Sequence, residues 1–253
     1  MNIQGEVVCI TGGARGIGKA TAEIFAKHGA EVWIGDIDLK QAQITADAIG
    51  KNAHAYQLDV TDADSFEAFL KAPKRPIRVL VNNAGIMNHG KFHEIPLASH
   101  LRELHIDLSS VIIGMHLILP EMLKNNQGHI INVASMAGKF TLAGVATYNA
   151  SKFGVVALSR SVRNEIKHSK VKITTILPSA VRTDLLSNIS SKGVPTYPPE
   201  AIAQEIFNAL THQQPEVTIP RWASVTAIAE QVLPEKFFDG LKRLIGGERL
   251  MKS

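Results

Sequence analysis

The chain has 253 residues, of which 45% are hydrophobic, so its length and composition fit one large globular domain better than two small ones. Its 27 Lys and Arg exceed its 23 Asp and Glu by a net charge of +4, and these basic residues are scattered, which argues against a nucleic-acid partner. The single cysteine, Cys9, excludes an intramolecular disulfide and is predicted to be a buried structural thiol.

Signals for secretion or membrane insertion are lacking in the sequence. The N-terminal stretch MNIQGEVVCITGG has neither the basic region nor the apolar core of a signal peptide. The longest apolar run, LSSVIIGMHLILPEML, is interrupted by His116, is stopped by Pro120, and falls short of the roughly 20 residues that span a bilayer. We therefore expect a soluble, cytoplasmic protein.

The first two-thirds of the chain alternate short β-branched runs with longer segments of helical period. Strands are predicted at 6–12, 31–36, 53–60, 77–85, 128–135 and 171–178. Helices are predicted at 16–28, 38–49, 62–71, in a long region that ends near 125, and at 147–168. Because crossover helices join parallel strands, this order predicts an α/β fold: a Rossmann-like, doubly wound parallel sheet with helices on both faces.

The regular alternation of predicted strands and helices is interrupted after the sixth predicted strand. Residues 179–199 are rich in Ser, Pro and Gly and are predicted to form a substrate loop with at most a short helix near Asp184–Ser187. A helix at 199–212 and a strand at 216–220 follow, and then a helical tail at about 221–253. Since neither an internal repeat nor a flexible linker is found, a single domain over 1–253 is predicted.

A glycine-rich turn, TGGARGIG, spans Thr11–Gly18 between the first predicted strand and the first helix. Glycine lets the backbone approach a pyrophosphate, and the helix N-terminus offers N–H groups and a partial positive charge. Glycine also serves ordinary turns, but the strand–loop–helix context favours a nucleotide cradle.

Acidic and amide residues follow the next strands at the same edge of the sheet. Asp36 lies about 20 residues after the glycine loop, where a carboxylate binds an adenosine ribose and repels a 2′-phosphate, which favours NAD over NADP. Arg15 or Lys40 could instead meet a phosphate, and Asp36 could be a turn or N-cap residue before the second helix. Asp59 could reach an adenine amino group, and the sequence NNAG at 82–85 ends the fourth strand.

The segment TYNASKFG places Tyr148 four residues before Lys152, on one face of a predicted helix. A phenol with a pKa near 10 is a poor base, but a neighbouring ammonium and an oxidised nicotinamide favour phenolate and lower that pKa toward the working range. Ser135 ends the fifth predicted strand and can donate to a substrate oxygen. The structural alternatives are a half-buried helix tyrosine, a solvated lysine and a turn-forming serine.

The glycine loop, NNAG, a serine and YxxxK in this order resemble the short-chain dehydrogenase/reductase family over roughly residues 5–185. The resemblance implies an oxidoreductase that uses NAD, less readily NADP, with catalytic Ser135, Tyr148 and Lys152, of which Lys152 also binds the nicotinamide ribose. It implies cofactor contacts along the carboxyl edge of the sheet, at Gly12, Ala14, Arg15, Gly16, Ile17, Gly18, Asp36, Asp59, Val60, Asn83, Ala84, Gly85, Tyr148, Lys152, Pro178, Val181 and Thr183.

One candidate catalytic residue departs from the family pattern. Where the family usually has Asn, ahead of a Leu-Pro pair, this chain has Asp107. In relatives that position bends the helix, and its main-chain carbonyl holds a water of the proton relay. We expect Asp107 to keep the relay with an altered pH dependence; a protonated Asp107 and a solvated helix residue are the alternatives.

The segments 86–98, 136–147 and 179–199 are expected to form the substrate side. They offer, among other apolar residues, Ile86, Met87, Met136, Phe140, Leu142, Leu185 and Leu186. They favour a neutral, fairly apolar secondary alcohol or ketone, steroid-like or long-chain, although Arg182 is a basic exception. His89 and His93 have ligand spacing without an evident third ligand, so no metal is predicted.

The family resemblance also implies a homodimer or homotetramer built on the helices at 97–125 and 147–168. Small residues that allow close helix contact there are Ser109, Ser110, Gly114, Ala150, Gly154 and Ala157. The tail could pack over the pocket, join an interface or, as the least expected option, rest on a membrane. Two rival functions are an NAD-binding regulator with little turnover and a dehydratase or epimerase on the same scaffold.

Overall fold

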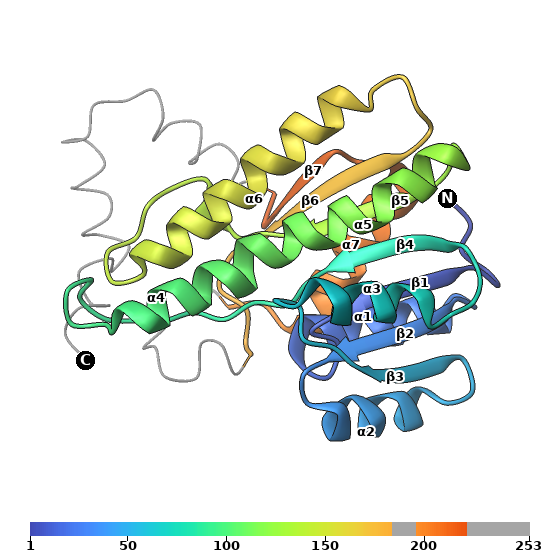
Figure 1. The fold of residues 1–253 in the computed structure, drawn as a ribbon, viewed down its shortest axis with the longest axis horizontal. Coiled ribbons are helices and arrows are strands. Elements are labelled where there is room, and N and C mark those ends of the chain that lie inside the picture. The colour runs from blue at the N-terminus through green and yellow to red at the C-terminus, as the bar shows by residue number, and fades with distance from the viewer. Residues whose placement is uncertain (184–195, 222–253) are drawn as a thin grey trace.

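The computed structural model describes residues 1–183 and 196–221; the predicted short helix near Asp184–Ser187 and nearly all of the predicted tail lie outside them. A seven-stranded, wholly parallel sheet forms the centre, in the order β3-β2-β1-β4-β5-β6-β7 (Figure 1). The strands are β1 (Val7–Thr11), β2 (Glu31–Asp36), β3 (Ala53–Gln57), β4 (Ile77–Asn82), β5 (His129–Val133), β6 (Lys172–Pro178) and β7 (Glu216–Ile219). The predicted Rossmann-like fold is confirmed.

Helices cover both faces of the sheet. The α-helices are α1 (Gly16–Lys27), α2 (Leu39–Ile49), α3 (Ala63–Lys71), α4 (Leu97–Leu104), α5 (Ser110–Lys124), α6 (Ala146–Glu165) and α7 (Pro199–His212). A π-helical segment, η1 (His105–Ser109), joins α4 to α5, and a 3₁₀ turn, η2 (Met136–Gly138), follows β5. Buried residues of α1, α2 and α7 share one core with the sheet, and those of α3, α5 and α6 share the other. Figure 1 shows α4, α5 and α6 running across one face.

The first strand illustrates why the sheet forms from short apolar runs. All five residues of β1 are buried, because both faces of a doubly wound sheet are covered. Side chains alternate across a strand, so Val8 and Ile10 enter one core, whereas Val7 and Cys9 enter the other. The predicted burial of the Cys9 thiol is confirmed.

At their carboxyl ends, the third and fourth predicted strands extend furthest beyond the observed ones. The third ends at Gln57 rather than at 60, and the fourth at Asn82 rather than at 85. After β4, the main-chain N–H groups of Asn83 and Ala84 leave the ladder and donate to the Thr11 hydroxyl, at 3.0 and 3.1 Å. The strand ends therefore become loops at the edge where a ligand is expected.

The long helical region Leu97–Lys124 has the length and hydropathy of a membrane span. Core helices share this property, and 39% of its most apolar window is buried within the chain, so the match is weak evidence of a membrane span. Pro120 lies inside α5, which ends at Lys124, close to the predicted end near 125.

Three of the small residues proposed for helix contacts between subunits face inward instead: Ser110, which is buried, Gly114 and Gly154. A Cβ on Gly114 would lie 2.6 Å from the Asn82 amide oxygen, and one on Gly154 would lie 2.8 Å from the Leu108 side chain. These glycines allow close packing within the chain. Ala150 and Ala157, by contrast, are exposed on α6.

Candidate active site

The glycine loop between β1 and α1 has a conformation that only glycine fits. Gly12 has a φ of +62°, and a Cβ there would lie 2.8 Å from the Ala84 Cα atom. A Cβ on Gly18 would lie 2.1 Å from the Gly12 carbonyl oxygen. The N-cap residue of α1, Arg15, makes no side-chain capping bond, so its side chain does not shield the first N–H groups of the helix. A glycine-rich loop, followed by a helix start whose N–H groups have no side-chain cap, is the arrangement that binds a pyrophosphate.

Residues after β4 hold this loop in place. The Asn83 side-chain amide donates to the carbonyl oxygens of Thr11 and Gly12, at 3.0 and 2.9 Å. With the Thr11 hydroxyl accepting from the main chain of Asn83 and Ala84, the two loops are locked together. In this structure Asn83 shapes the cradle, and a direct contact with a cofactor stays a prediction.

Asp36, at the end of β2, is the candidate ribose-binding residue. Its carboxylate accepts hydrogen bonds from the main-chain N–H groups of Ala14 (3.0 Å) and Asp38 (3.1 Å). The alternative that Asp36 caps α2 is wrong, because Asp38 does so by accepting from the Gln41 N–H at 3.0 Å. The carboxylate is thus fixed beside the glycine loop.

The two cations that could have met a phosphate differ in their surroundings. The Arg15 guanidinium lies 2.9 Å from the Asp38 carboxylate in an exposed ion pair, and Lys40 is exposed. The main-chain N–H of Gln41, followed by Arg15, holds the pKa of Asp38 below its usual range. Arg15 therefore has an acidic partner beside the expected adenosine site.

The remaining predicted cofactor positions also lie along the carboxyl edge. Asp59 is exposed and accepts from the Thr61 N–H and hydroxyl, at 2.9 and 2.6 Å, so its carboxylate forms a turn. Thr183 reaches the glycine loop, where its methyl group would be 3.1 Å from a Cβ on Gly16. The other predicted positions in these segments are Ile17 and Gly85, together with the buried Val60, Pro178 and Val181.

Ser135, Tyr148 and Lys152 come together from two elements. Ser135 is the N-cap of η2, and its hydroxyl accepts from the Ala137 N–H at 3.1 Å, which leaves its own proton free to donate. On α6, the Lys152 ammonium lies 5.3 Å from the centre of the Tyr148 ring. Both α6 side chains are buried, with residue exposures of 8% for Tyr148 and 4% for Lys152. The solvated-lysine alternative is therefore wrong.

The electrostatics of Tyr148 differ from the sequence prediction. Burial raises the pKa of the Tyr148 phenol above its usual value. Lys152 and the contact with Ser135 lower this pKa, as predicted, whereas Asp107 and Glu103 raise it further. The predicted lowering combined Lys152 with an oxidised nicotinamide; Lys152 acts in that direction here, but burial outweighs it, so in this structure Tyr148 is a protonated phenol at neutral pH.

Asp107 lies in the π-helical segment η1 and is completely buried, so the solvated alternative is wrong. One carboxylate oxygen is 3.1 Å from the Lys152 ammonium, and the other accepts from the Ile86 N–H at 2.8 Å. Burial raises the pKa of Asp107, against the opposing effect of Lys152. Burial lowers the pKa of Lys152, but Asp107, Tyr148 and Glu103 together outweigh it and the pKa is raised.

A second buried acid, Glu103, lies one turn before Asp107 and was missed at the sequence level. It is 1% exposed and accepts from the Asn88 N–H at 2.8 Å. The i, i+4 spacing of the two acids on one helix was the available signal. His100, also missed, contacts the Thr147 hydroxyl (2.5 Å) and the Phe92 carbonyl oxygen (3.0 Å), and no sequence pattern indicated it.

The apolar residues expected on the substrate side divide into groups. Met87 and Leu142 pack around Tyr148 in a small cluster with Ala137 and Val145. Met136 and Phe140 belong to the core between the sheet and α5 and α6. Ile86 meets Asp107 through its main chain. The predicted Leu185 and Leu186 lie outside the described residues.

Within 1–183 and 196–221, no group of three or more His, Cys, Asp or Glu side chains could hold a metal ion. His93 is exposed and lies 3.8 Å from the Glu94 carboxylate.

Sequence comparisons match the chain to known dehydrogenases. A model of the short chain dehydrogenase family matches residues 6–193. An uncharacterized oxidoreductase of Bacillus subtilis, YxbG, is 36% identical over 195 residues, which are 74% of this chain and 71% of that protein. Estradiol 17-beta-dehydrogenase 11 of Pongo abelii is 29% identical over 253 residues, covering 96% and 84% of the two chains.

Solved structures share the fold. A short chain dehydrogenase/reductase from Burkholderia phymatum in complex with NAD has a TM-score of 0.83 at 22% identity, over 91% of this chain and 94% of that one. A 3-ketoacyl-(acyl-carrier-protein) reductase from Brucella melitensis complexed with NADH has a TM-score of 0.78 at 26% identity, over 82% and 91%.

Proposed function

This chain belongs to the short-chain dehydrogenase/reductase family, and we propose that it transfers a hydride between NAD(H) and a neutral, fairly apolar secondary alcohol or ketone. Family membership makes it an enzyme that acts on a CH–OH or carbonyl group. The observation that carries the proposal is the convergence of Ser135, Tyr148 and Lys152 near Gly85, in the loop after β4 that holds the glycine loop in place.

A nicotinamide dinucleotide fits the residues present. The glycine loop and the uncapped start of α1 would hold its pyrophosphate, and Lys152 would hold the nicotinamide ribose. NAD rather than NADP is supported by the fixed Asp36 carboxylate and by the pairing of Arg15 with Asp38. When bound, the cofactor supplies or accepts the hydride. The NAD and NADH bound in the two solved relatives support the same choice.

Side chains of the protein would transfer the proton to or from the substrate oxygen. In the reducing direction Ser135 donates a hydrogen bond to the carbonyl oxygen, and Tyr148 gives that oxygen its phenolic proton. The raised pKa of Tyr148 suits this role, because the phenol is protonated at neutral pH. In the oxidising direction the proton moves from the alcohol to a phenolate, so oxidation should accelerate as pH rises.

Asp107 would act through Lys152. Its carboxylate, which lies on η1, pairs with the Lys152 ammonium and so fixes the lysine next to the Tyr148 ring. The carboxylate would also be the charge partner of Lys152 while the lysine exchanges a proton. The family's main-chain relay at this position is compatible with the π-helical bend. The proposed role is that of a positioning residue with an electrostatic effect on Tyr148.

A fairly apolar substrate is supported by the surroundings of Tyr148. Met87, Leu142 and Val145 form an apolar wall against the ring. The similarity to estradiol 17-beta-dehydrogenase 11 over nearly the whole chain points in the same direction. We further propose a homodimer or homotetramer, supported by exposed apolar and small residues on the long helices, namely Leu101, Ile112, Ala150 and Ala157.

The experiment is NADH formation from NAD with secondary alcohols of graded size: isopropanol, cyclohexanol and estradiol. We expect turnover to rise toward the larger alcohols, NAD to be preferred over NADP, and Tyr148→Phe to abolish turnover while leaving the fold intact. Turnover that survives Tyr148→Phe would contradict the assignment of the proton donor, and a preference for NADP would contradict the role of Asp36.

An NAD-binding regulator is a second candidate, favoured by the ion pair that already occupies the Lys152 ammonium. It predicts that NADH binds, as followed by its fluorescence, while none of the three alcohols is oxidised. In that case Asp107→Asn, which releases the lysine, is the variant expected to gain turnover.

A further inference from the structure

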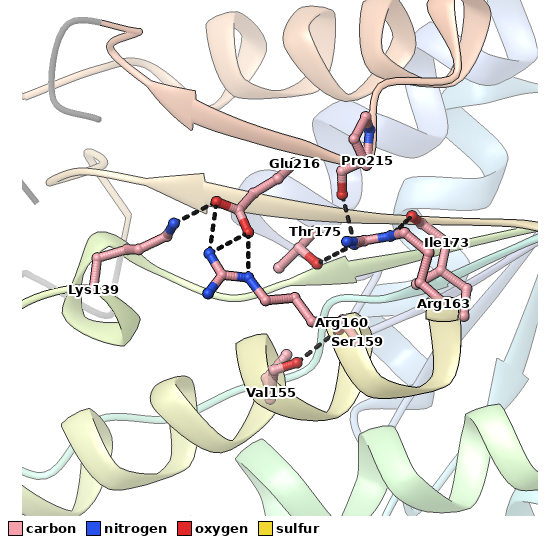
Figure 2. Close-up of polar contacts among 9 residues, drawn as sticks. All are labelled: Lys139, Val155, Ser159, Arg160, Arg163, Ile173, Thr175, Pro215 and Glu216. Carbon is pink, nitrogen blue, oxygen red and sulfur yellow. Dashed lines mark hydrogen bonds and ion pairs between the residues drawn. The ribbon is translucent and has the colours of Figure 1, made fainter. Parts of the chain in front are cut away.

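The turn that starts at Ser135 ends in a polar cluster outside the site described above. Figure 2 shows Lys139, the residue after η2, and Arg160, from α6, both reaching Glu216 at the start of β7. We propose that Glu216, by binding Lys139, positions the Ser135 hydroxyl for the reaction. This inference rests on the proposed function, and it assigns Lys139 and Glu216 as positioning residues.

The pair is partly buried and well defined. The Lys139 ammonium donates to one carboxylate oxygen of Glu216, and the Arg160 guanidinium contacts both oxygens at 3.0–3.2 Å. Only 13% of the Lys139 side chain and 21% of the Glu216 side chain are exposed, against 49% for Arg160. Burial raises the pKa of Glu216, but Lys139 and Arg160 outweigh it and the pKa is lowered, so the anchor stays ionised.

The turn transmits this anchoring to Ser135. The Gly138 N–H donates to the Ser135 carbonyl at 2.9 Å, and the Lys139 N–H donates to the Met136 carbonyl at 2.8 Å. At its middle the turn lies directly on α6, since a Cβ on Gly138 would be 2.6 Å from the Lys152 carbonyl oxygen. A tight turn pressed on the helix of Tyr148 and Lys152, and tied at its far end to Glu216, leaves Ser135 little freedom.

The strand that carries Glu216 is held independently. Arg163, one turn after Arg160 on α6, donates to the carbonyl oxygens of Ile173 (2.9 Å) and Pro215 (2.7 Å). It also donates to the Thr175 hydroxyl at 3.2 Å (Figure 2). Arg163 therefore fixes β6 and the start of β7 to α6 without touching the turn after Ser135. This makes it a matched control for a purely structural role.

The first test is spectroscopic and needs no substrate. The ionisation of Tyr148 is followed by phenolate absorbance as the difference between each enzyme and its Tyr148→Phe counterpart. Because the contact with Ser135 lowers the pKa of Tyr148, Ser135→Ala and Lys139→Met should both raise the pH at which Tyr148 ionises. Arg163→Met should leave that pH unchanged, and Lys139→Arg should restore it. An unchanged ionisation in Lys139→Met would overturn the proposal.

The second test is a double-mutant cycle with the alcohol that gives the highest turnover among isopropanol, cyclohexanol and estradiol. Lys139→Met should lower kcat about tenfold without changing the KM for NAD. In the Ser135→Ala background the same change should have almost no effect, because the hydroxyl it positions is gone. Arg163→Met should lower the thermal midpoint but keep kcat within about twofold.

The outcomes separate the two claims. If Ser135→Ala is impaired and Lys139→Met lowers kcat equally with and without the Ser135 hydroxyl, the positioning role is wrong and the proposed function stands. If Ser135→Ala retains the wild-type kcat, the proposed role of Ser135 fails, and the inference fails with it.

Discussion

Two ion pairs at opposite ends of the site face opposite surroundings. Beside the expected adenosine, Arg15 pairs with Asp38, and the two side chains are 57% and 39% exposed. Beneath Tyr148, Lys152 pairs with Asp107, and those side chains are 5% and 0% exposed. Water screens the first pair, so it can exchange partners at little cost. The second pair is withdrawn from water, so removing one partner leaves an uncompensated charge. The ion pair at the cofactor end can thus exchange partners, whereas the ion pair at the catalytic end depends on both of its charges.

The largest expected effect follows from breaking the buried pair. Asp107→Ala leaves the Lys152 ammonium buried without its partner and removes the acceptor of the Ile86 N–H. We expect the free energy of unfolding to fall by about 3 kcal/mol, measured by urea denaturation. A loss of unfolding free energy no larger than that of Arg15→Ala, the control in the next paragraph, would show that the pair is not structurally important.

Breaking the exposed pair is the matched control. Arg15→Ala removes the partner of Asp38 where solvent already competes, so the urea midpoint should stay within measurement error. NADP, if it binds at all, should bind less tightly to this variant, because a cation near the ribose is lost. Improved use of NADP would contradict the arrangement.

A smaller, electrostatic effect is expected from Asp107→Asn, which keeps the shape but not the charge. The carboxylate of Asp107 and that of Glu103 disfavour the Tyr148 phenolate, while Lys152 and Ser135 favour it. Removing one negative charge lowers the pKa of Tyr148, so the pH profile of alcohol oxidation should move to lower pH by roughly one pH unit. An unchanged pH–rate profile, or one displaced to higher pH, would contradict the coupling.

The sequence carries most of the fold and the identity of the site. Short apolar runs alternating with helices specify the parallel sheet, because the inner strands β1, β4 and β5 are buried on both faces. The glycine loop, Ser135, Tyr148 and Lys152 are readable because their order along the chain places them at one edge. The end of the fourth strand was predicted too late, because the N–H groups of Asn83 and Ala84 donate to the Thr11 hydroxyl rather than to a neighbouring strand. This is a tertiary interaction that the local sequence does not show.

What the sequence could not supply depends on burial and on distant partners. The sequence could not show how strongly burial raises the pKa of Tyr148, because the cost of desolvation depends on what packs over the ring. The pairing of Lys139 with Glu216 joins residues 77 positions apart, and no local pattern indicates it. The inward orientation of Gly154 is likewise set by a neighbouring helix, through Leu108.

The most direct test of the central claim is isotope transfer. Cyclohexanol or estradiol carrying deuterium on its alcohol carbon is incubated with NAD and the enzyme, and the NADH is analysed by mass spectrometry. The account predicts deuterium on the NADH with the wild-type chain and none with Tyr148→Phe. NADH that binds to the protein while no deuterium is ever transferred from either alcohol would contradict it and favour a regulator.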